Sequence, residues 1–187
     1  MAWASHPDAL EILKVPGYLF WNPTALDVEA HWGTKLGFSE NGINFEPSIK
    51  IAELTTPESG PEPRMMIYIG GYPRISCILQ NYNTTLLSRL FPGMITGTTV
   101  KFPGTVKMGT NIMTATYSKP VLFVPDDQAN NPACLLQLAT PKVTENMKWL
   151  FSHRKRALFP VVFVAGRKDA NVDGCYTIGP LSGLTLR

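Results

Sequence analysis

Residues 120–138 read PVLFVPDDQANNPACLLQL, and this stretch decides the fold class. Two short apolar runs, 121–124 and 134–138, are separated by a segment of Pro, Asp and Asn. Short runs of apolar and β-branched residues that are bounded by turn formers are typical of β-strands. The same pattern recurs at 65–69, 75–79 and 176–178, so the chain is predicted to be rich in strands.

Two further runs predict strands that differ in burial. At 143–151 the odd positions hold Val, Glu, Met, Trp and Phe and the even ones Thr, Asn, Lys and Leu, which predicts a half-buried strand. The run 158–165 is apolar at successive positions, with Pro160 near its start. It predicts a strand that is covered on both sides.

One amphipathic helix is predicted at 84–91, with Asn83 or Thr84 as its N-cap and Pro92-Gly93 as its stop. A further helical turn is expected within 25–32. The fold class is therefore mainly β, a sandwich or a small barrel, with a single helix laid over the sheet. The residues predicted to form the packing face of that helix are Leu86, Leu87, Leu90 and Phe91.

The composition indicates one domain with an under-charged surface. A chain of 187 residues makes one ordinary domain, here taken as 1–187. Charged residues are 17%, against about 25% in typical globular domains. The shortfall favours a surface that is partly covered by other subunits.

The charges are unevenly distributed along the chain. Residues 1–64 hold nine acidic and four basic residues, a net charge of −5, whereas 142–187 hold three acidic and eight basic residues, a net charge of +5. Opposite charges in different parts of one chain suit a subunit that meets copies of itself. The basic cluster 154–156 is interpreted as a solvated turn.

The cysteines and the N-terminus favour a cytoplasmic place of synthesis. Cys77, Cys134 and Cys175 are odd in number and widely spaced, which predicts free thiols and no disulfide framework. Residues 1–13 lack the basic and apolar regions of a signal peptide. The apolar runs are too short to span a membrane.

No catalytic, metal-binding or cofactor-binding motif is found, and the chain is predicted not to be an enzyme. His6, His31 and His153 are far apart, and none has a carboxylate three or four residues away in a helical context. Asp126 and Asp127 lack the spacing of a calcium loop and predict a turn with Asx-type hydrogen bonds.

Two long loops are predicted at 54–64 and 93–116. The first holds three prolines and a glycine, and the second is rich in Thr and Gly. Loops of this length in a compact domain usually carry function, here contact with a partner. Residues 1–14 are expected to form a flexible N-terminal arm.

The order of these features resembles the tail tube proteins of bacteriophages. The segment 15–23 is similar to the family's opening strand, and 32–43 to its Gly-rich turn and long second strand. The Pro-rich loop and the short helix follow. The C-terminal segments 120–127, 135–141, 149–152, 158–163 and 176–179 are similar to its closing strands. No single motif is diagnostic, and the Thr/Gly-rich segment after the helix departs from the family.

The resemblance implies a subunit of hexameric rings that share an inner β-barrel and stack into a tube, the conduit for DNA ejection. Implied partners are other copies, tape measure, terminator, baseplate and sheath proteins, and double-stranded DNA in passage, with no cofactor. The subunit would be assembled in the host cytoplasm and reside in the virion tail. Implied inter-ring loop residues are Pro57, Glu58, Pro61, Glu62 and Arg64, implied lumen residues are Glu40, Glu46 and Glu53, and Arg74 would lie at an interface.

Several alternatives remain open. A tail terminator, baseplate initiator or head–tail adaptor would form single rings, and a type VI secretion tube would stack as a phage tube does. A carbohydrate-binding β-sandwich, which is a different class of protein, would be a monomer with exposed Trp or Tyr side chains.

Overall fold

The chain folds into antiparallel β-sheets, with almost no helix among the described residues. The structure is a computed structural model that describes residues 16–37, 39–47, 50–54, 65–79, 87, 90–91, 95–96, 99–100, 109–143, 159–166 and 176–186. Two 3-10 turns, η2 (Glu29–His31) and η4 (Leu181–Gly183), lie outside the sheets. The described strands are β1 (Gly17–Trp21), β2 (Thr34–Lys35), β3 (Ser39–Glu46), β4 (Lys50–Leu54), β5 (Met65–Gly70), β6 (Arg74–Leu79), β7 (Ile95–Thr96), β8 (Thr99–Val100), β9 (Lys119–Pro125), β10 (Ala133–Val143), β11 (Phe159–Ala165) and β12 (Tyr176–Gly179).

Eight strands form one sheet in the order β2-β1-β9-β10-β11-β6-β3, with β12 also paired to β10. The first part of β10 pairs with β9 and β12, and the last part, from Ala139, pairs with β11. The register against β9 shifts between Leu136 and Ala139, and such a bulge bends a strand and increases its twist. The bend divides the sheet into a first layer (β2, β1, β9, β12 and the start of β10) and a second layer (the end of β10, β11, β6 and β3).

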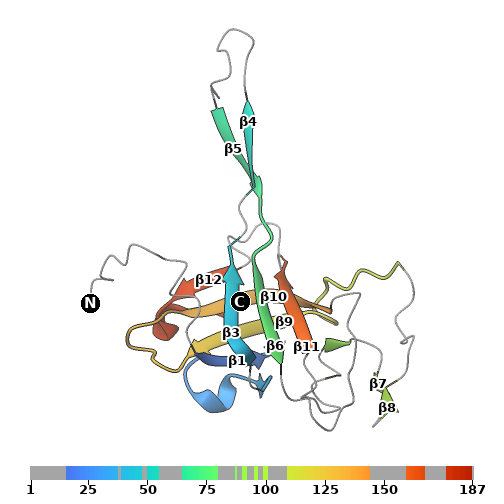
Figure 1. The fold of residues 1–187 in the computed structure, drawn as a ribbon, viewed down its shortest axis with the longest axis vertical. Helices are drawn as coiled ribbons and strands as arrows, with labels where there is room; N and C mark the ends of the chain where they lie inside the picture. Colours follow the sequence, from blue (N-terminus) through green and yellow to red (C-terminus); the bar gives the residue numbers. More distant parts are fainter. Residues whose placement is uncertain are drawn as a thin grey trace.

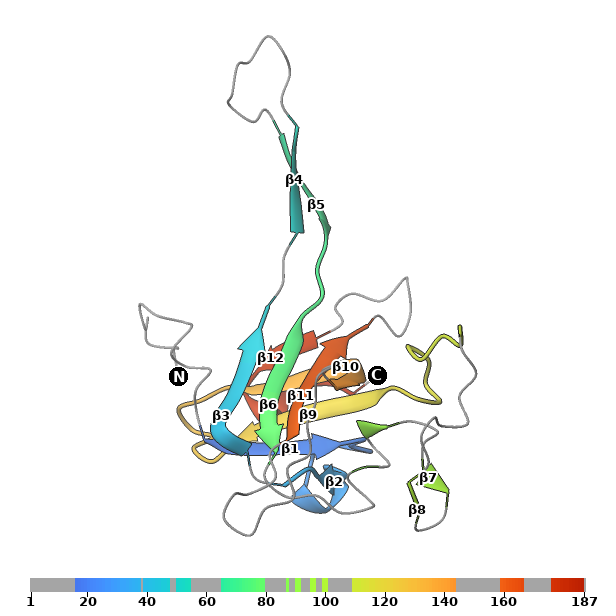
Figure 2. The same ribbon diagram turned by 45° about the vertical axis from the view of Figure 1, so that its right-hand side comes forward.

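The two layers enclose the main core. Strands of the second layer cross those of the first at a steep angle (Figures 1 and 2). Trp21 of β1 meets Phe163 of β11 with ring centroids 5.9 Å apart, and Phe45 of β3 meets Tyr176 of β12 at 5.4 Å. The fully buried residues Leu19, Ile75, Leu79, Val121, Leu136, Phe159, Val161 and Phe163 belong to the same cluster.

A second apolar cluster covers the outer face of the first layer. Phe20, Leu122 and Leu135 project from that face onto Trp32, which precedes β2, and Leu184, which follows η4. The Gln137 side chain, buried at the bulge of β10, donates a hydrogen bond of 2.7 Å to the Thr185 carbonyl. The first layer is therefore covered on both faces by this chain.

The predicted helix is described at only three positions. Leu87 and Leu90 are helical and buried in the main core, and the Phe91 N–H donates to the Leu87 carbonyl at 2.9 Å, one helical turn back. Phe91 packs against the same core. Leu86 and the rest of 84–91 lie outside the described residues. The turn expected within 25–32 is η2.

Two sequence interpretations need correction. The strand at 158–165 is not covered equally on both sides: Phe159, Val161, Phe163 and Ala165 are buried, but Val162 and Val164 are half-buried and Pro160 is exposed. The valines on the outer face are apolar, and for this reason the sequence predicts burial on both faces of a strand that contacts the core with only one. The loop predicted at 93–116 contains the short hairpin β7–β8.

The described residues include no helix with the length and apolar character that a membrane span requires.

Candidate assembly interface

The second layer ends at a long edge strand. β3 has eight residues and pairs on one side with β6, and within the described part of the chain no strand pairs with its other side. The opposite end of the sheet is β2, which has only two residues. A long open edge is a template for pairing with another chain. A bulge between Glu40 and Ile43, with Gly42 at φ +78°, interrupts this edge.

The outer face of the second layer carries polar and apolar residues in rows. Asn44, Ser76 and Val162 are register partners in one row, and Glu46, Arg74 and Val164 in the next. The Arg74 Nε lies 3.5 Å from Glu46 Oε2, and both side chains are about half exposed (51% and 54%). Such a pair contributes little to stability, but it neutralises the local charge.

The three predicted lumen residues fall into two places. In the register of β3 with β6, Glu40 is opposite Ile78 and Glu46 is opposite Arg74. Ile78 and Arg74 are an even number of residues apart, so they share one side of the strand, the outer face of the second layer. Both glutamates therefore occupy positions on that face. Glu53 lies in β4, a different sheet, opposite Met66. The structure therefore places two of the three positions on one face, opposite β6 residues that are four positions apart.

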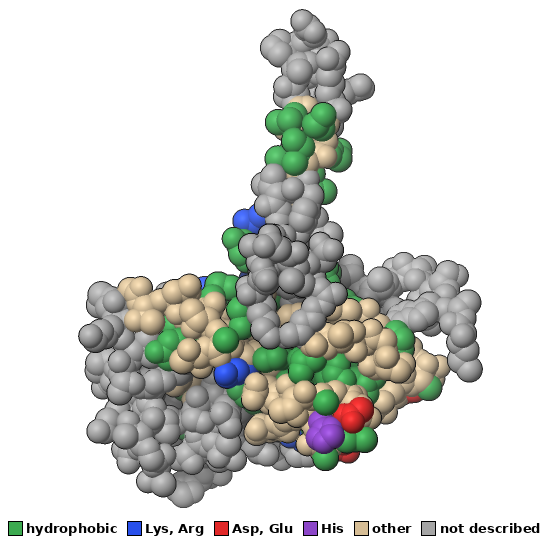
Figure 3. All heavy atoms as spheres, turned by 180° about the vertical axis from the view of Figure 1, so that it is seen from behind, with side chains coloured by type: hydrophobic (Ala, Val, Ile, Leu, Met, Phe, Trp, Pro, Cys, Tyr) green, Lys and Arg blue, Asp and Glu red, His purple; other side chains and the backbone are tan. Residues whose placement is uncertain are grey.

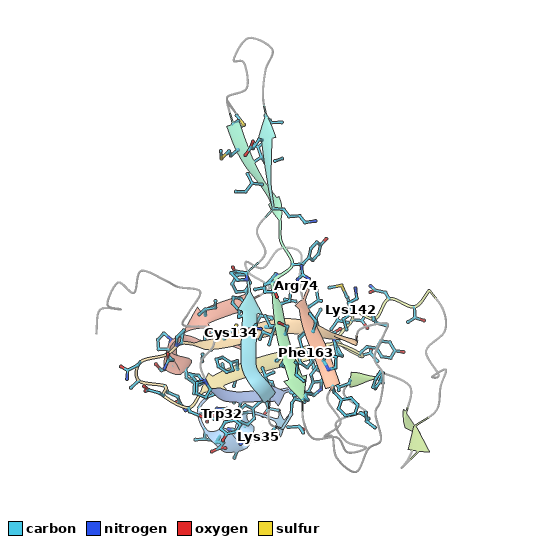
Figure 4. All side chains as sticks on the ribbon, in the orientation of Figure 1. Trp32, Lys35, Arg74, Cys134, Lys142 and Phe163 are labelled. Carbon is cyan, nitrogen blue, oxygen red and sulfur yellow. The ribbon has the colours of Figure 1, made fainter. Side chains whose placement is uncertain are left out.

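A hairpin arm projects from the end of the second layer. Strands β4 and β5 continue the chain from β3 and back into β6, and among the described strands they pair only with each other (Figure 1). Arg74 lies at the base of this arm, where β6 begins (Figure 4). Lys50 and Tyr72 also lie near the base, with the Lys50 Nζ 5.5 Å from the centre of the Tyr72 ring.

The arm is rich in exposed apolar side chains for its size. Hydrophobic side chains cover much of the described part of the arm that faces the viewer in the space-filling view (Figure 3). Of the ten large hydrophobic residues exposed in the described part of the chain, five lie on the arm: Ile51 (54% exposed), Leu54 (48%), Met65 (56%), Met66 (61%) and Ile67 (41%). The predicted inter-ring residues Pro57, Glu58, Pro61, Glu62 and Arg64 fall between β4 and β5 in the sequence and lie outside the described residues.

The described residues hold no group of three His, Cys, Asp or Glu side chains that would suit a metal ion. Cys77 and Cys134 are buried free thiols, and burial raises the pKa of Cys77 to about 12. The Asp127 carboxylate accepts hydrogen bonds from the backbone N–H groups of Ala129 (3.2 Å) and Asn130 (3.3 Å), so an Asx-type turn occupies the predicted position. A hydrogen bond from the Asn130 side chain lowers the pKa of Asp127.

One pairing was missed in the sequence. His31 Nδ1 lies 2.7 Å from Asp27 Oδ1, four residues earlier, across the exposed turn that contains η2. The hydrogen bond to His31 lowers the pKa of Asp27. Both side chains are solvent-exposed and lie four residues apart, so the pair is a local feature of the turn.

The described tryptophans do not form an exposed aromatic surface. Trp21 lies in the main core and Trp32 in the second cluster, where its ring meets Phe20 edge-on at 5.3 Å. Lys35 instead lies over the ring of Tyr18 on the neighbouring strand, 3.2 Å from its centre. These aromatic residues stabilise the packing of β1, β2 and the segment between them.

The arm is the feature that sequence reasoning located least well. The sequence predicts strand candidates on both sides of the Pro-rich segment 54–64, but it assigns the interface to that segment and not to the strands that flank it. The available signal was the run Ile51, Ala52 and Leu54 opposite Met65 to Ile67, two apolar segments on either side of a Pro-rich turn. No protein-family model matches this chain, and no curated protein matches it by sequence.

Proposed function

We propose that this protein is a structural subunit that polymerises, as stacked hexameric rings, into a bacteriophage tail tube through which DNA is ejected. The observation that carries the proposal is the second layer, which ends at the open edge strand β3 and continues into a projecting arm. Strand addition at an open edge joins subunits side by side, and a projecting arm reaches beyond the subunit's own body.

The distribution of covered surfaces supports this role. The first layer has its two faces covered, by the main core and by the second cluster. The outer face of the second layer carries half-buried and exposed side chains, among them Glu46, Arg74 and Val162. In a ring closed through the β3 edge, this face would line the channel, with Glu40 and Glu46 as its acidic positions.

A channel for DNA must avoid binding phosphate tightly. Each phosphate neutralised by Lys or Arg adds affinity and slows passage. On the proposed channel face the Arg74 guanidinium is paired with Glu46, which offsets its positive charge. Lys142, exposed near the end of β10 and paired in register with Val162, is a further cation on this face.

The test is negative-stain electron microscopy of the purified protein over a range of concentrations, with the mass of the particles measured on the same samples. Hollow tubes built of six-fold rings are expected. Discrete rings that never stack would instead assign the protein to the terminators or adaptors. A monomer at every concentration, even when supplied with preformed tube ends as seeds, would overturn the proposal.

A further inference from the structure

Residues 180–186 contact the outer face of the first layer without joining its strands, and we call this segment the strap. It follows β12, and in the part of the chain that the structure describes the strand pairing of this stretch ends at Gly179. The Gly183 N–H donates a hydrogen bond of 2.8 Å to the Pro180 carbonyl, which closes the turn η4 inside the strap. Such a bond needs no contact with the sheet.

One fully buried side chain attaches the strap to the first layer. Leu184 is 7% exposed and belongs to the second cluster, whereas Leu181 and Leu186 pack against that cluster and are only half-buried. The other residues of the strap are exposed: Pro180, Ser182, Gly183 and Thr185. The apolar contact of the strap therefore depends mainly on Leu184.

The Thr185 carbonyl supplies a polar attachment. It accepts the hydrogen bond of 2.7 Å from the buried Gln137 side chain of β10. Water can bond to the same two groups once the strap lifts, so the net stabilisation from this hydrogen bond is modest.

The surface beneath the strap is apolar and almost fully buried. The first layer contributes five residues to the second cluster: Phe20, Leu122, Val124, Ala133 and Leu135. They lie in β1, β9 and β10, which are paired with one another and not with the strap. Lifting the strap therefore leaves these strands paired and removes cover from an apolar surface.

We propose that the strap is a reversible cover, which opens as a unit while the two layers stay folded and thereby exposes the apolar outer face of the first layer. Ordering the strap costs conformational entropy at every residue, and one buried side chain with one side-chain hydrogen bond offsets little of that cost. Segments with few buried contacts open at a lower free energy than the paired strands of a core. The inference concerns a single chain, so it stands whether or not copies of the chain assemble.

The test places a thiol under the strap in the full-length chain. Ala133→Cys in a Cys175→Ser background introduces it at a position of the second cluster that pairs in register with Gly179, the residue before the strap. The adjacent Cys134 projects from the other face of β10 into the main core and is the internal control. Dilute protein is alkylated with iodoacetamide at pH 8 at several urea concentrations below the unfolding transition, and peptide mass spectrometry identifies the modified site.

The introduced thiol is expected to react at least about tenfold faster than Cys134, with a weak dependence on urea, because local opening exposes little surface. Cys134 is expected to react only when the main core unfolds, with a steep dependence on urea. Adding Leu184→Ala is expected to speed the reaction of the introduced thiol at least about tenfold and to leave that of Cys134 unchanged. Thr185→Ala is the matched control, because it shortens an exposed side chain and keeps the carbonyl, and it is expected to change neither rate.

Equal rates and an equal urea dependence for the two thiols would overturn the inference, since the strap would then open only when the whole chain unfolds. The inference also fails if Leu184→Ala speeds the reaction of both thiols alike. A third contrary outcome is an introduced thiol that reacts as fast in the folded chain as in the unfolded one, because the strap would then not cover it.

Discussion

Residues along β11 alternate between the core and the outer face, so substitutions at neighbouring positions are expected to change the free energy of unfolding by different amounts. Phe163 is fully buried against Trp21, whereas its neighbour Val164 is half-buried on the outer face. Phe163→Ala is expected to lower the free energy of unfolding by about 3–5 kcal/mol, because it leaves a cavity between the layers. Val164→Ala is expected to lower it by less than about 1.5 kcal/mol.

Urea unfolding followed by tryptophan fluorescence measures both changes. Equal losses at the two positions would mean that β11 is covered equally on both faces, as its apolar sequence had predicted. A small loss at Phe163 would contradict the two-layer core.

The buried thiols make a second prediction at the scale of the residue. Burial raises the pKa of Cys77 to about 12 and also raises that of Cys134. In a Cys175→Ser variant at pH 8, neither thiol is expected to react with Ellman's reagent until urea unfolds the protein, because only an accessible thiolate is nucleophilic. Rapid labelling of the folded variant would contradict the burial of these side chains.

The same shift has a defined pH dependence. Both thiols keep their protons in the folded chain, whereas unfolded thiols lose theirs near pH 8.5. Their contribution to stability is therefore fully present below that pH, and it is lost as the pH rises from there toward about 12, the folded pKa of Cys77. The free energy of unfolding of the Cys175→Ser variant is expected to decline over that range.

At the scale of the element, the pairing of β1 with β9 depends on a glycine. A Cβ atom added at Gly17 would lie 2.5 Å from the Val124 carbonyl oxygen and 2.6 Å from a Phe123 ring carbon. Gly17→Ala is therefore expected to separate the strands locally and lower the free energy of unfolding by about 1–3 kcal/mol. At Gly179 in β12 the added atom would meet nothing within 4 Å.

Gly179→Ala is the matched control, since it makes the same change in another strand of the same layer. Its effect on the free energy of unfolding is expected to stay within about 0.5 kcal/mol. Thermal or urea unfolding distinguishes the two variants, and a neutral Gly17→Ala would contradict the close approach of β1 and β9.

Most described strands could be predicted from local patterns, but their arrangement could not. The runs 121–124, 134–138 and 75–79 became β9, part of β10 and β6, because turn formers bound each run. The bulge that lets β10 join two layers has no marker in the sequence, where Gln137 is one polar residue in an apolar run. The structure shows that the Gln137 side chain donates a hydrogen bond to the carbonyl of Thr185, 48 residues away, a contact that local sequence does not predict.

The arm shows a different limit of sequence reasoning. Apolar residues at 65–67 predict a strand but not whether that strand lies in the core or projects from it, because local pattern does not specify tertiary contacts. For the same reason the sequence does not show that Glu46 and Glu53 lie in different sheets. They belong to consecutive strands, but Glu53 lies in the arm and Glu46 in the body. The candidate interface was therefore only partly predictable.

At the scale of the whole molecule, the proposed channel face makes a prediction about DNA. Glu46 and Arg74 are a half-exposed pair on this face, so replacing either one is expected to leave folding nearly unchanged. Glu46→Lys reverses a charge beside Arg74 in every subunit of the proposed tube. Assembled Glu46→Lys tubes are therefore expected to bind short duplex DNA more tightly than wild-type tubes, with an affinity that falls steeply as salt is added.

The swap variant Glu46→Arg/Arg74→Glu is the matched control, because it keeps both charges and exchanges their strands. Fluorescence anisotropy of a labelled duplex, measured with intact tubes from low to physiological salt, should show tighter binding for Glu46→Lys alone. If the swap variant and Glu46→Lys both bind as weakly as the wild type, then this face does not line the channel. The outer ends of the tubes give a second check: if a duplex too wide-ended to enter the channel binds Glu46→Lys tubes as tightly as a plain duplex does, the added charge lies on the outside of the tube and the charge argument for the lumen fails.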